Sequence, residues 1–452
     1  MMVRKRRSRP SRWVHWQTPS WISTTPQVKK DCRPIQGSLA FRYSGIGNSL
    51  SAETSIIRQQ YSLSYTIPSY EERPSSSGQY FAFWKPATDS EVYIALQNTS
   101  ASAIQIEPSL RIGNQTVLLS RRDLGPHQMQ TMHFPDDLGS ANTPLWAANE
   151  VGGVNIHVVS AYGRDGRNAA INTSGWVEDD NLGFSAMLSF HDPAMAVSTE
   201  LFGTQILFGP QADLGQASFT SALLLRNITN QPVNFTARFI SDQHGVPLST
   251  MLPLPALDAQ EVRKIDLTDL QRHGLIPQEL RTGAVQIDYA GNRGDVMGRV
   301  FSISSDGSLG LYTALESFGA IGGSGVYWTA DGNWNSILTV TNFSDHADTM
   351  HLMLTHETGN FTLAPIPLAP LQSANVSLKD VVSGALKSVD GQPWPAGITS
   401  GGYLLTGGDV RSKLVAKEQA VNWQQKLATP YYVTAIYETA CLTPNALSLV
   451  VG

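Results

Sequence analysis

The sequence has 452 residues, of which 41% are hydrophobic and 15% are charged, and its formal net charge is −5 at pH 7. At roughly 150 residues per domain the length predicts about three domains, and the hydrophobic fraction excludes a disordered chain. No run of about 18 apolar residues occurs, which excludes a membrane-spanning helix, and the lack of a large positive charge argues against a dedicated nucleic-acid-binding protein.

The amino-terminal segment is basic. Six of its first twelve residues are Arg or Lys, and we predict that residues 1–30 form a basic disordered tail. The run 11–23 is interrupted by His, Gln and Pro, so it lacks the apolar core of about 7–15 residues that a secretion signal needs. Cys32 and Cys441 lie near opposite ends of the chain, and neither has the nearby Cys or His partner of a metal site. A disulfide between these two cysteines remains an open alternative.

Three sequence markers recur along the rest of the chain at intervals of about 115–130 residues. The first is an apolar strand that ends in Asn-x-Ser/Thr. The second follows 26 to 30 residues later and is a Leu with apolar residues at positions +8 and +10 and an Asp at +12. The third is a Gly that precedes a short strand. The marker residues are Asn98, Asn227 and Asn342; Leu124, Leu257 and Leu368; Asp136, Asp269 and Asp380; and Gly153, Gly283 and Gly402.

These markers divide the chain into three predicted β-sandwich repeats at 78–190, 200–317 and 320–438. Apolar residues alternate at period two within the repeats, and turn residues recur every 8–12 positions or so, which is typical of antiparallel β-sandwiches. Helical periodicity is scarce, and the best helix candidate is 268–273, which Gly274 ends.

The two ends of the chain are predicted to lie outside the repeats. Residues 31–77 are a strand-containing amino-terminal segment followed by a polar linker. Residues 441–452 carry the spacing Pro-x-x-Leu-x-Leu-x-x-Gly, which looks like the start of a truncated further immunoglobulin-like module. We therefore expect that both ends were cut from a longer protein.

The strand ends at Asn-x-Ser/Thr, the Leu-x-Pro turns, the Gly-led strands and the joining segment 184–193 together resemble a group of uncharacterised bacterial proteins. Those proteins are exported or surface-located and consist of tandem immunoglobulin-like β-sandwich repeats. The resemblance covers about residues 40–452 and implies an all-β fold of tandem antiparallel immunoglobulin-like β-sandwiches. It also implies an extracellular or cell-surface location, although the chain shows no signal peptide, and it supplies no catalytic residues.

Residues Glu178, Asp179 and Asp180 form the densest acidic loop and are the candidate metal ligands. Calcium is the one cofactor that such a loop would hold, because calcium is bound by several converging carboxylate oxygens. The alternative is a solvated loop.

The other charged and titratable residues favour structural roles. Each of the three marker Asp residues is expected to cap a turn or short helix after a strand, rather than to bind an ion. His346, His351 and His356 are five residues apart, so on a strand successive members would lie on opposite faces, and no zinc site is predicted. The tripeptide 293–295, Arg-Gly-Asp, is interpreted as a Gly-rich turn, with receptor recognition as the alternative.

Aromatic residues gather near the starts of the first and third repeats. Trp84, Trp328 and Trp334 are the candidate ligand-binding residues, because exposed aromatic faces bind sugar rings in many β-sandwich modules. Packing in the core or between domains is the alternative, and it is the commoner role of aromatic residues in alternating strands.

No catalytic residues are predicted, since the sequence has no G-x-S-x-G elbow and no HExxH motif, and neither cysteine has a catalytic context. We therefore expect a non-catalytic structural or adhesive β-sandwich array of a larger surface or secreted bacterial protein. The alternative is a carbohydrate-binding accessory region of a secreted polysaccharide-degrading enzyme. The expected partner is a polysaccharide or a surface protein, and the oligomeric state is left open.

Overall fold

The computed structural model of the chain describes residues 37–42, 53–58, 63–68, 70–71, 79–84, 90–113, 115–148, 151–160, 171–179, 184–188, 190–211, 214–243, 246–307, 309–317, 322–356, 358–408, 412–422, 424–425, 427–431, 433–436 and 446–451. Every strand pair within these residues is antiparallel, and helices are few and short. The all-β prediction is confirmed. The predicted tail 1–30 and both cysteines lie outside the described residues.

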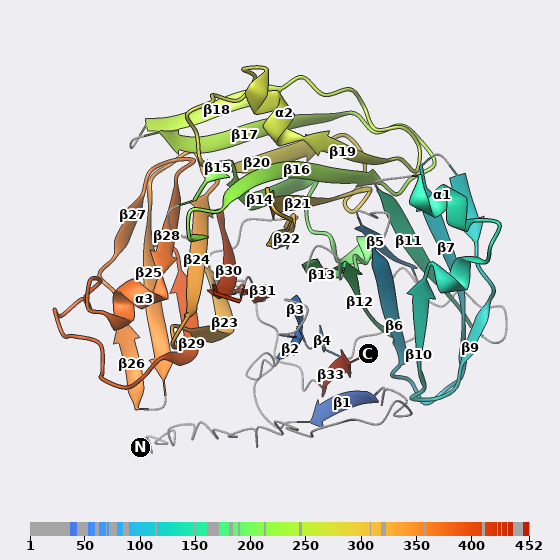
Figure 1. Cartoon of the computed structure of the whole chain (residues 1–452), viewed down its shortest axis with the longest axis horizontal. Coiled ribbons are helices and arrows are strands. Elements are labelled where there is room, and N and C mark those ends of the chain that lie inside the picture. Colours follow the sequence, from blue (N-terminus) through green and yellow to red (C-terminus); the bar gives the residue numbers. More distant parts are fainter. Residues whose placement is uncertain are drawn as a thin grey trace, which may run out of the picture.

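Nine consecutive strands, β5 to β13, form what we call unit 1 (Figure 1). They are β5 (Gln79–Trp84), β6 (Glu91–Asn98), β7 (Ile104–Ile112), β8 (Gln115–Leu118), β9 (Arg122–Leu124), β10 (Met129–Phe134), β11 (Gly152–Ser160), β12 (Ile171–Asp179) and β13 (Phe184–Leu188). The 3-10 turn η2 (Asp136–Leu138) and the helix α1 (Thr143–Ala147) lie between β10 and β11, and the 3-10 turn η3 (Pro193–Met195) follows β13.

Units 2 and 3 follow along the chain. Unit 2 holds β14 (Glu200–Leu207), β15 (Gly209–Pro210), β16 (Ser218–Asn227), β17 (Phe235–Gln243), β18 (Val246–Leu252), β19 (Val262–Asp266), α2 (Leu267–Arg272), β20 (Thr282–Tyr289), β21 (Val296–Ser304) and β22 (Gly310–Ala314). Unit 3 holds β23 (Gly322–Thr329), β24 (Trp334–Asn342), β25 (Asp348–His356), β26 (Gly359–Thr362), β27 (Ile366–Leu368), β28 (Ser373–Ser377), α3 (Leu378–Val382), β29 (Ser400–Thr406), β30 (Leu414–Asn422), β31 (Leu427–Tyr431) and β32 (Val433–Ile436).

The three units have the same strand order. In unit 1 the first sheet runs β10-β6-β12-β13 and the second runs β5-β11-β7-β8. The first sheets of units 2 and 3 pair β19-β16-β21-β22 and β28-β24-β30-β31, and their second sheets run β14-β20-β17-β18 and β23-β29-β25-β26. The spacing of the sequence markers therefore coincides with a repeated pairing of strands.

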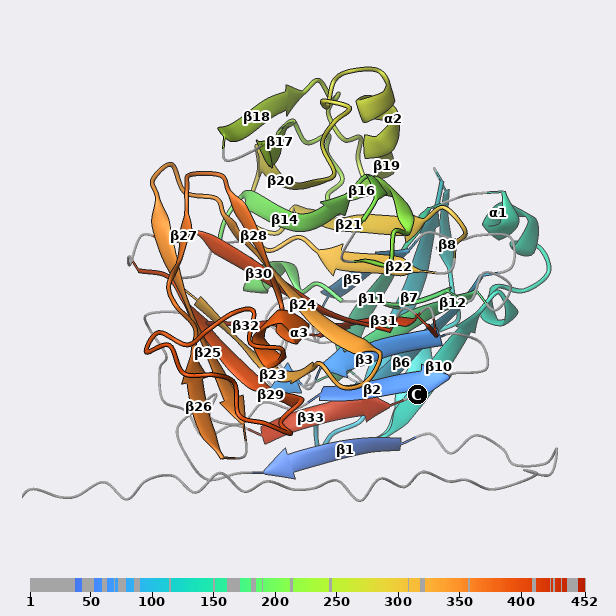
Figure 2. The ribbon, with the colours of Figure 1, turned by 60° about the vertical axis from the view of Figure 1, so that its left-hand side comes forward.

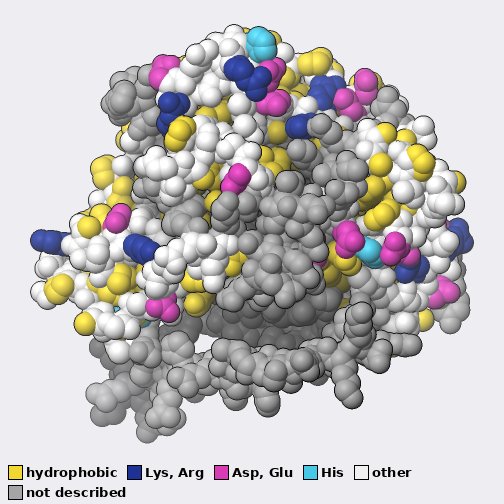
Figure 3. All heavy atoms as spheres, in the orientation of Figure 1, with side chains coloured by type: hydrophobic (Ala, Val, Ile, Leu, Met, Phe, Trp, Pro, Cys, Tyr) yellow, Lys and Arg dark blue, Asp and Glu magenta, His cyan; other side chains and the backbone are white. Residues whose placement is uncertain are grey.

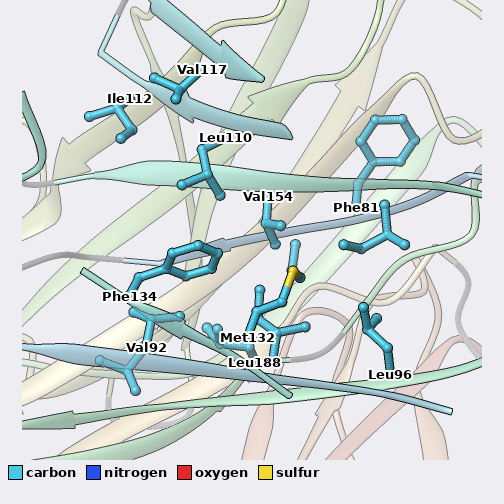
Figure 4. Close-up of a cluster of buried hydrophobic side chains, with 14 of the residues drawn as sticks. Phe81, Val92, Leu96, Leu110, Ile112, Val117, Met132, Phe134, Val154 and Leu188 are labelled. Atoms are coloured by element: carbon cyan, nitrogen blue, oxygen red, sulfur yellow. The ribbon is translucent and has the colours of Figure 1, made fainter. Parts of the chain in front are cut away.

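Each unit encloses a hydrophobic core between its two sheets. Figure 4 shows the core of unit 1, where Leu110 and Val154 of the second sheet lie near Val92, Met132 and Phe134 of the first. Buried and half-buried residues alternate strictly along β7, as expected for a strand that has one face in the core. The second sequence marker follows from this packing, because its Leu and its +8 and +10 residues are core residues in all three units.

The marker Asn residues are clamps between two loops. Asn98, Asn227 and Asn342 end β6, β16 and β24, and their side chains are 0% exposed. In unit 3 the amide Nδ2 of Asn342 donates hydrogen bonds to the carbonyl oxygens of His346 and Ala369 at 2.9 and 3.1 Å. Its Oδ1 accepts from the backbone N–H of Ser344 at 3.0 Å.

The same hydrogen bonds recur around the marker Asn in units 1 and 2. Because a buried amide must have its donors and acceptors satisfied, the Asn-x-Ser/Thr tripeptide and the Leu turn recur together. This clamp accounts for the tripeptide as a requirement of the fold.

The short helical turns after β10, β19 and β28 refine one prediction and confirm another. The helix expected at 268–273 is α2, and Gly274 stops it at φ +76°. Asp136, Asp269 and Asp380 lie in the first turns of η2, α2 and α3 rather than at the N-cap. The cap of α2 is Asp266, whose side chain accepts from the N–H of Asp269 at 2.8 Å. An acidic residue in a first turn is favoured by the partial positive charge of the free N–H groups there.

Neighbouring units pack through buried surfaces. The core of unit 1 extends onto the first sheet of unit 2 through Leu224, Met297 and Phe301. Between units 2 and 3, one hydrophobic cluster joins Leu207 and Leu309 to Ile337, and a second contains Phe202 and Phe343. Polar contacts cross the second junction as well. They are the Thr204–Thr341 hydroxyl pair at 2.7 Å, the Lys413–Glu200 ion pair at 3.0 Å, and the Lys417–Glu316 ion pair.

The units form an arch, and the terminal strands lie between its two legs (Figure 1). The strand β33 (Ala446–Val451) pairs with β1 (Gly37–Arg42) and β4 (Tyr70–Glu71), so the two ends of the described chain share one sheet. The hairpin β2 (Glu53–Arg58) and β3 (Leu63–Pro68) lies beside it (Figure 2). The edge strand β22 contacts the edge strands β13 and β31, and β3 contacts both β13 and β31. Among the described residues, no helix is long and apolar enough to cross a membrane.

Candidate functional site

One titratable and aromatic cluster lies on the first sheet of unit 1, on the side turned away from the core. Tyr93 stands between His133 and Trp176 in the strand register, and its ring stacks on both, with centroids 4.4 and 5.1 Å apart. Two residues away along the same strands, Glu91 lies opposite Glu178. Figure 3 shows acidic, histidine and basic side chains gathered over this part of unit 1.

The cluster is held by its own contacts. The Tyr93 hydroxyl donates to Glu91, while the His133 ring lies 3.4 Å from Glu91 and 2.9 Å from Asp136. Trp176 and Glu178 are 3% and 4% exposed. A substrate therefore has little access to the second carboxylate, although the two carboxylates lie on neighbouring strands.

The same sheet face has a different use in unit 2. The positions equivalent to Tyr93 and Trp176, counted from the marker Asn and through the register, are Ala222 and Phe301. Both belong to the hydrophobic cluster that joins units 1 and 2. In unit 1 the terminal strand β33 instead contacts β6 and β12. The sequence could have indicated the cluster only through the i, i+2 pairs Glu91/Tyr93 and Trp176/Glu178.

Of the three predicted metal residues, the structure describes the side chain of Glu178 alone. Glu178 is a buried strand residue of β12 rather than part of a solvated loop. The side chain of Asp179 and all of Asp180 lie outside the described residues. Across the part of the chain that the structure describes, no group of three or more His, Cys, Asp or Glu residues is placed to hold a metal ion.

The predicted ligand platform is corrected at Trp328. Its side chain is 0% exposed, and the indole N–H donates to the carbonyl oxygen of Gly402 at 3.0 Å. Trp394 packs edge-on against it at 5.4 Å, so the ring belongs to the core of unit 3. Trp334 is half-buried at the start of β24. Trp84 ends β5, and its side chain lies outside the described residues.

The Arg-Gly-Asp tripeptide is a turn packed against the link between units 1 and 2. Gly294 is buried at φ +86°, and its N–H donates to the Tyr289 hydroxyl at 2.9 Å. A Cβ at this position would lie 2.8 Å from the Cα of Pro193. The Asp295 carboxylate accepts from the N–H of Asn292 at 2.6 Å. The interpretation as a turn is supported by these bonds, and the tripeptide does not project as a free tip.

A groove of about 450 Å³ lies at the junction of units 1 and 2. One wall is the outer face of the second sheet of unit 1, where Glu107 and Ser109 of β7 lie beside Asn155 and His157 of β11. The opposite wall is formed by loops of unit 2, and Leu118 stands at the rim with 82% of its surface exposed. The volume is within the range of small-molecule sites, about 300–1,000 Å³.

The unit 2 wall of the groove is fixed by the Asn227 clamp. The loop 228–230 follows directly after Asn227, and the Gln260 amide donates to the carbonyl oxygen of Ile228 at 2.6 Å. The backbone N–H of Gln260 donates to the carbonyl oxygen of Thr229 at 2.9 Å. This loop pair therefore holds its shape without a ligand.

A buried arginine fixes the unit 1 wall. Arg226 of β16 is 0% exposed and donates to the carbonyl oxygens of Ala82 and Val154 at 2.6 and 3.1 Å, and also to Asn155 Oδ1. Burial lowers the pKa of Arg226 to about 9, so the side chain is still cationic at neutral pH. Asn155 in turn donates to the Ser109 hydroxyl at 3.2 Å.

The unit 1 member of the third sequence marker, Gly153, is explained at the same place. A Cβ on Gly153 would meet the guanidinium of Arg226, with Cζ 2.7 Å away. Only glycine allows the two backbones of units 1 and 2 to approach with the arginine between them. The sequence signalled this glycine and gave no sign of its arginine partner.

The charges of the groove cancel. Glu107 forms an ion pair with Arg121, and its second oxygen lies 3.5 Å from the His157 ring. The other polar lining side chains, Ser109, Asn155, Asn230 and Gln260, are uncharged. The groove thus offers many hydrogen-bonding groups without a net field that would select an anion or a cation.

Comparison with known proteins adds no assignment, because no protein-family model, curated protein or solved structure matches the chain.

Proposed function

We propose that the chain is a non-catalytic structural and adhesive module of a larger surface or secreted bacterial protein, built from immunoglobulin-like β-sandwiches. The observation that carries the proposal is the burial of polar groups between the units. A fully buried Arg226 and the Thr204–Thr341 pair join unit 2 to its two neighbours. Separating the units would leave these buried polar groups without their hydrogen-bonding partners, so the contacts hold the units together.

A rigid arch presents its loops in fixed relative positions, which lowers the entropy cost of binding through several loops at once. A surface module that binds through several loops needs these fixed positions, whereas units joined by flexible linkers would be suited to act as spacers. The bacterial and extracellular assignment rests on the resemblance of the sequence repeats.

Small-angle scattering of the full chain tests the rigid arrangement. A compact body of 452 residues has a radius of gyration of about 23 Å. A scattering curve typical of three beads on a flexible string would contradict the proposal.

Binding and turnover are tested together with beads coated with the full chain. The beads are placed on immobilised polysaccharides and bacterial envelope proteins, and the same surfaces are assayed for released sugars and peptides. Retention without release supports the proposal. Release that stops in Glu178→Gln would identify an enzyme and overturn it.

A second candidate function is a carbohydrate-binding region that accompanies a secreted polysaccharide-degrading enzyme. The groove between units 1 and 2 is the observation that favours it, since it is preformed, uncharged overall and rich in hydrogen-bonding side chains. Among the aromatic residues first proposed for this role, Trp328 does not favour it, because it is buried.

A further inference from the structure

We propose that the groove between units 1 and 2 is a binding site for an uncharged polyhydroxylated ligand, a short neutral saccharide, and that Glu107 and Asn155 are its central hydrogen-bonding residues. The assignment rests on the proposed carbohydrate-binding function and locates it. The argument runs from the shape of the groove to its charges and then to its apolar rim.

The shape is preformed on both sides. The unit 2 loop is held by the Asn227 clamp and by Gln260, and the unit 1 face is part of a continuous sheet. A ligand therefore need not order the walls, which removes a large part of the cost of binding. Sites for small ligands occur preferentially at such junctions between domains.

The hydrogen-bonding groups are oriented before the ligand arrives. Asn155 is fixed because Arg226 donates to its Oδ1 and its own Nδ2 donates to Ser109. Glu107 pairs with Arg121 and lies beside the His157 ring. A carboxylate accepts hydrogen bonds from hydroxyl groups, and a guanidinium and an amide donate to them. Sugar hydroxyls both donate and accept, so they match this alternation.

The charge pattern separates saccharides from other polar ligands. A phosphate or carboxylate ligand would meet the Glu107 carboxylate, and a cationic ligand would meet Arg121. Because these two side chains already pair with each other, a neutral ligand binds without displacing an ion pair.

The apolar residues lie where a sugar ring would place its C–H groups. Leu118 is 82% exposed at the rim, Leu119 is half-buried next to it, and Ile228 lies on the opposite wall. Together these three side chains offer an apolar surface beside the polar groups of the groove. Phe81 is 5% exposed under the cation of Arg226, so it shapes the base of the groove and does not stack on the ligand.

The experiment uses the full chain and a defined set of probes. Saturation-transfer NMR is recorded with neutral disaccharides of glucose, mannose, galactose and N-acetylglucosamine, with glucuronic acid, and with uncharged dipeptides. The strongest disaccharide is then titrated by calorimetry. We expect transfer to one or more neutral disaccharides and none to glucuronic acid or to the dipeptides.

Two variants locate the site. Glu107→Ala removes the central acceptor and should weaken the disaccharide at least about tenfold, because hydrogen bonds to charged groups are the strong ones. Leu118→Thr removes an apolar contact from a side chain that the fold does not bury, so its loss of affinity cannot be ascribed to unfolding. Met251→Thr is the matched control, since Met251 is 52% exposed in unit 2 and lies outside the groove.

The outcomes are distinct. If no neutral disaccharide shows saturation transfer, the saccharide site is overturned. The proposed adhesive function is then still tested separately, by small-angle scattering and by retention of coated beads. Binding that survives both groove variants, or that prefers glucuronic acid or a dipeptide, overturns the assignment even if the chain binds surfaces.

Discussion

The buried Arg226 provides the sharpest test of how units 1 and 2 are joined. Its guanidinium donates to two backbone carbonyls and to Asn155, and its Nη1 occupies the space that a side chain at Gly153 would need. Removing one side of a buried polar set costs about 3–5 kcal/mol. Arg226→Met recovers part of the packing, so we expect a loss of about 2–4 kcal/mol in the free energy of unfolding.

The second change is Gly153→Ala. The new Cβ would lie 2.7 Å from Arg226 Cζ, and overpacking of this kind costs about 1–3 kcal/mol. In the Arg226→Met background the flexible thioether can give way, so the same alanine should cost much less. The double variant is therefore expected to be more stable than the sum of the single effects by about 1–2 kcal/mol.

The assay is equilibrium urea unfolding followed by tryptophan fluorescence, with calorimetry to show whether the units unfold together. Arg272→Met is the control, because the Arg272 side chain is 67% exposed on α2, and we expect a change within about 0.5 kcal/mol. Additivity of the two main changes within about 0.5 kcal/mol would refute the direct contact between the glycine and the arginine.

Three further outcomes are expected. Asn342→Asp turns two amide donors into acceptors that face carbonyl oxygens and should cost about 2–4 kcal/mol, whereas Asn375→Asp, at an exposed position, should be near neutral; equal melting temperatures would exclude the clamp. Burial lowers the pKa of His191 below 6.5, so on acidification the unfolded chain takes up the proton before the folded chain does, and the wild type should lose stability as pH falls below about 6.5. In pH-dependent melts His191→Gln should flatten the slope of stability against pH, and an unchanged slope would show that another group causes it. Trp328→Phe loses the bond to Gly402 and should cost about 1–3 kcal/mol without affecting retention on polysaccharides; reduced retention at an unchanged melting temperature would restore its role as a ligand platform.

Local patterns predicted the strands well because their cause is local. Period-two alternation marks β17 (Phe235–Gln243) and β25 (Asp348–His356), since alternate side chains of a strand point to opposite faces. The helix α2 was predictable from its acidic first turn and from Gly274. The role of each marker Asp was misjudged by a few positions, because a capping residue and a first-turn residue look alike in sequence.

The candidate site was not predictable in the same way. Glu107, Asn155 and Gln260 belong to two units and carry no motif, and only the packing of unit 1 on unit 2 brings them together. Trp328 shows the converse, since the sequence favours a core role for an aromatic residue in an alternating strand without excluding a surface role, and the side chain is buried. Its burial was decided by the partner sheet and by Trp394.

The sequence by itself determined the strands and the repeat of the Asn and Leu markers, because each of these follows from hydrogen bonding or packing that every unit must satisfy. The need for glycine at position 153 came from the tertiary structure, because the side chain that leaves no room for a Cβ there is Arg226 of unit 2. The tertiary structure alone decided the use of the equivalent sheet faces. In unit 2 the first sheet carries Leu224 and Arg226 against unit 1, and in unit 1 it carries Tyr93 and Trp176 beneath the terminal strands. The physical reason is that strand pairing is set by the backbone, whereas the partner of a sheet face depends on side chains supplied by distant parts of the chain.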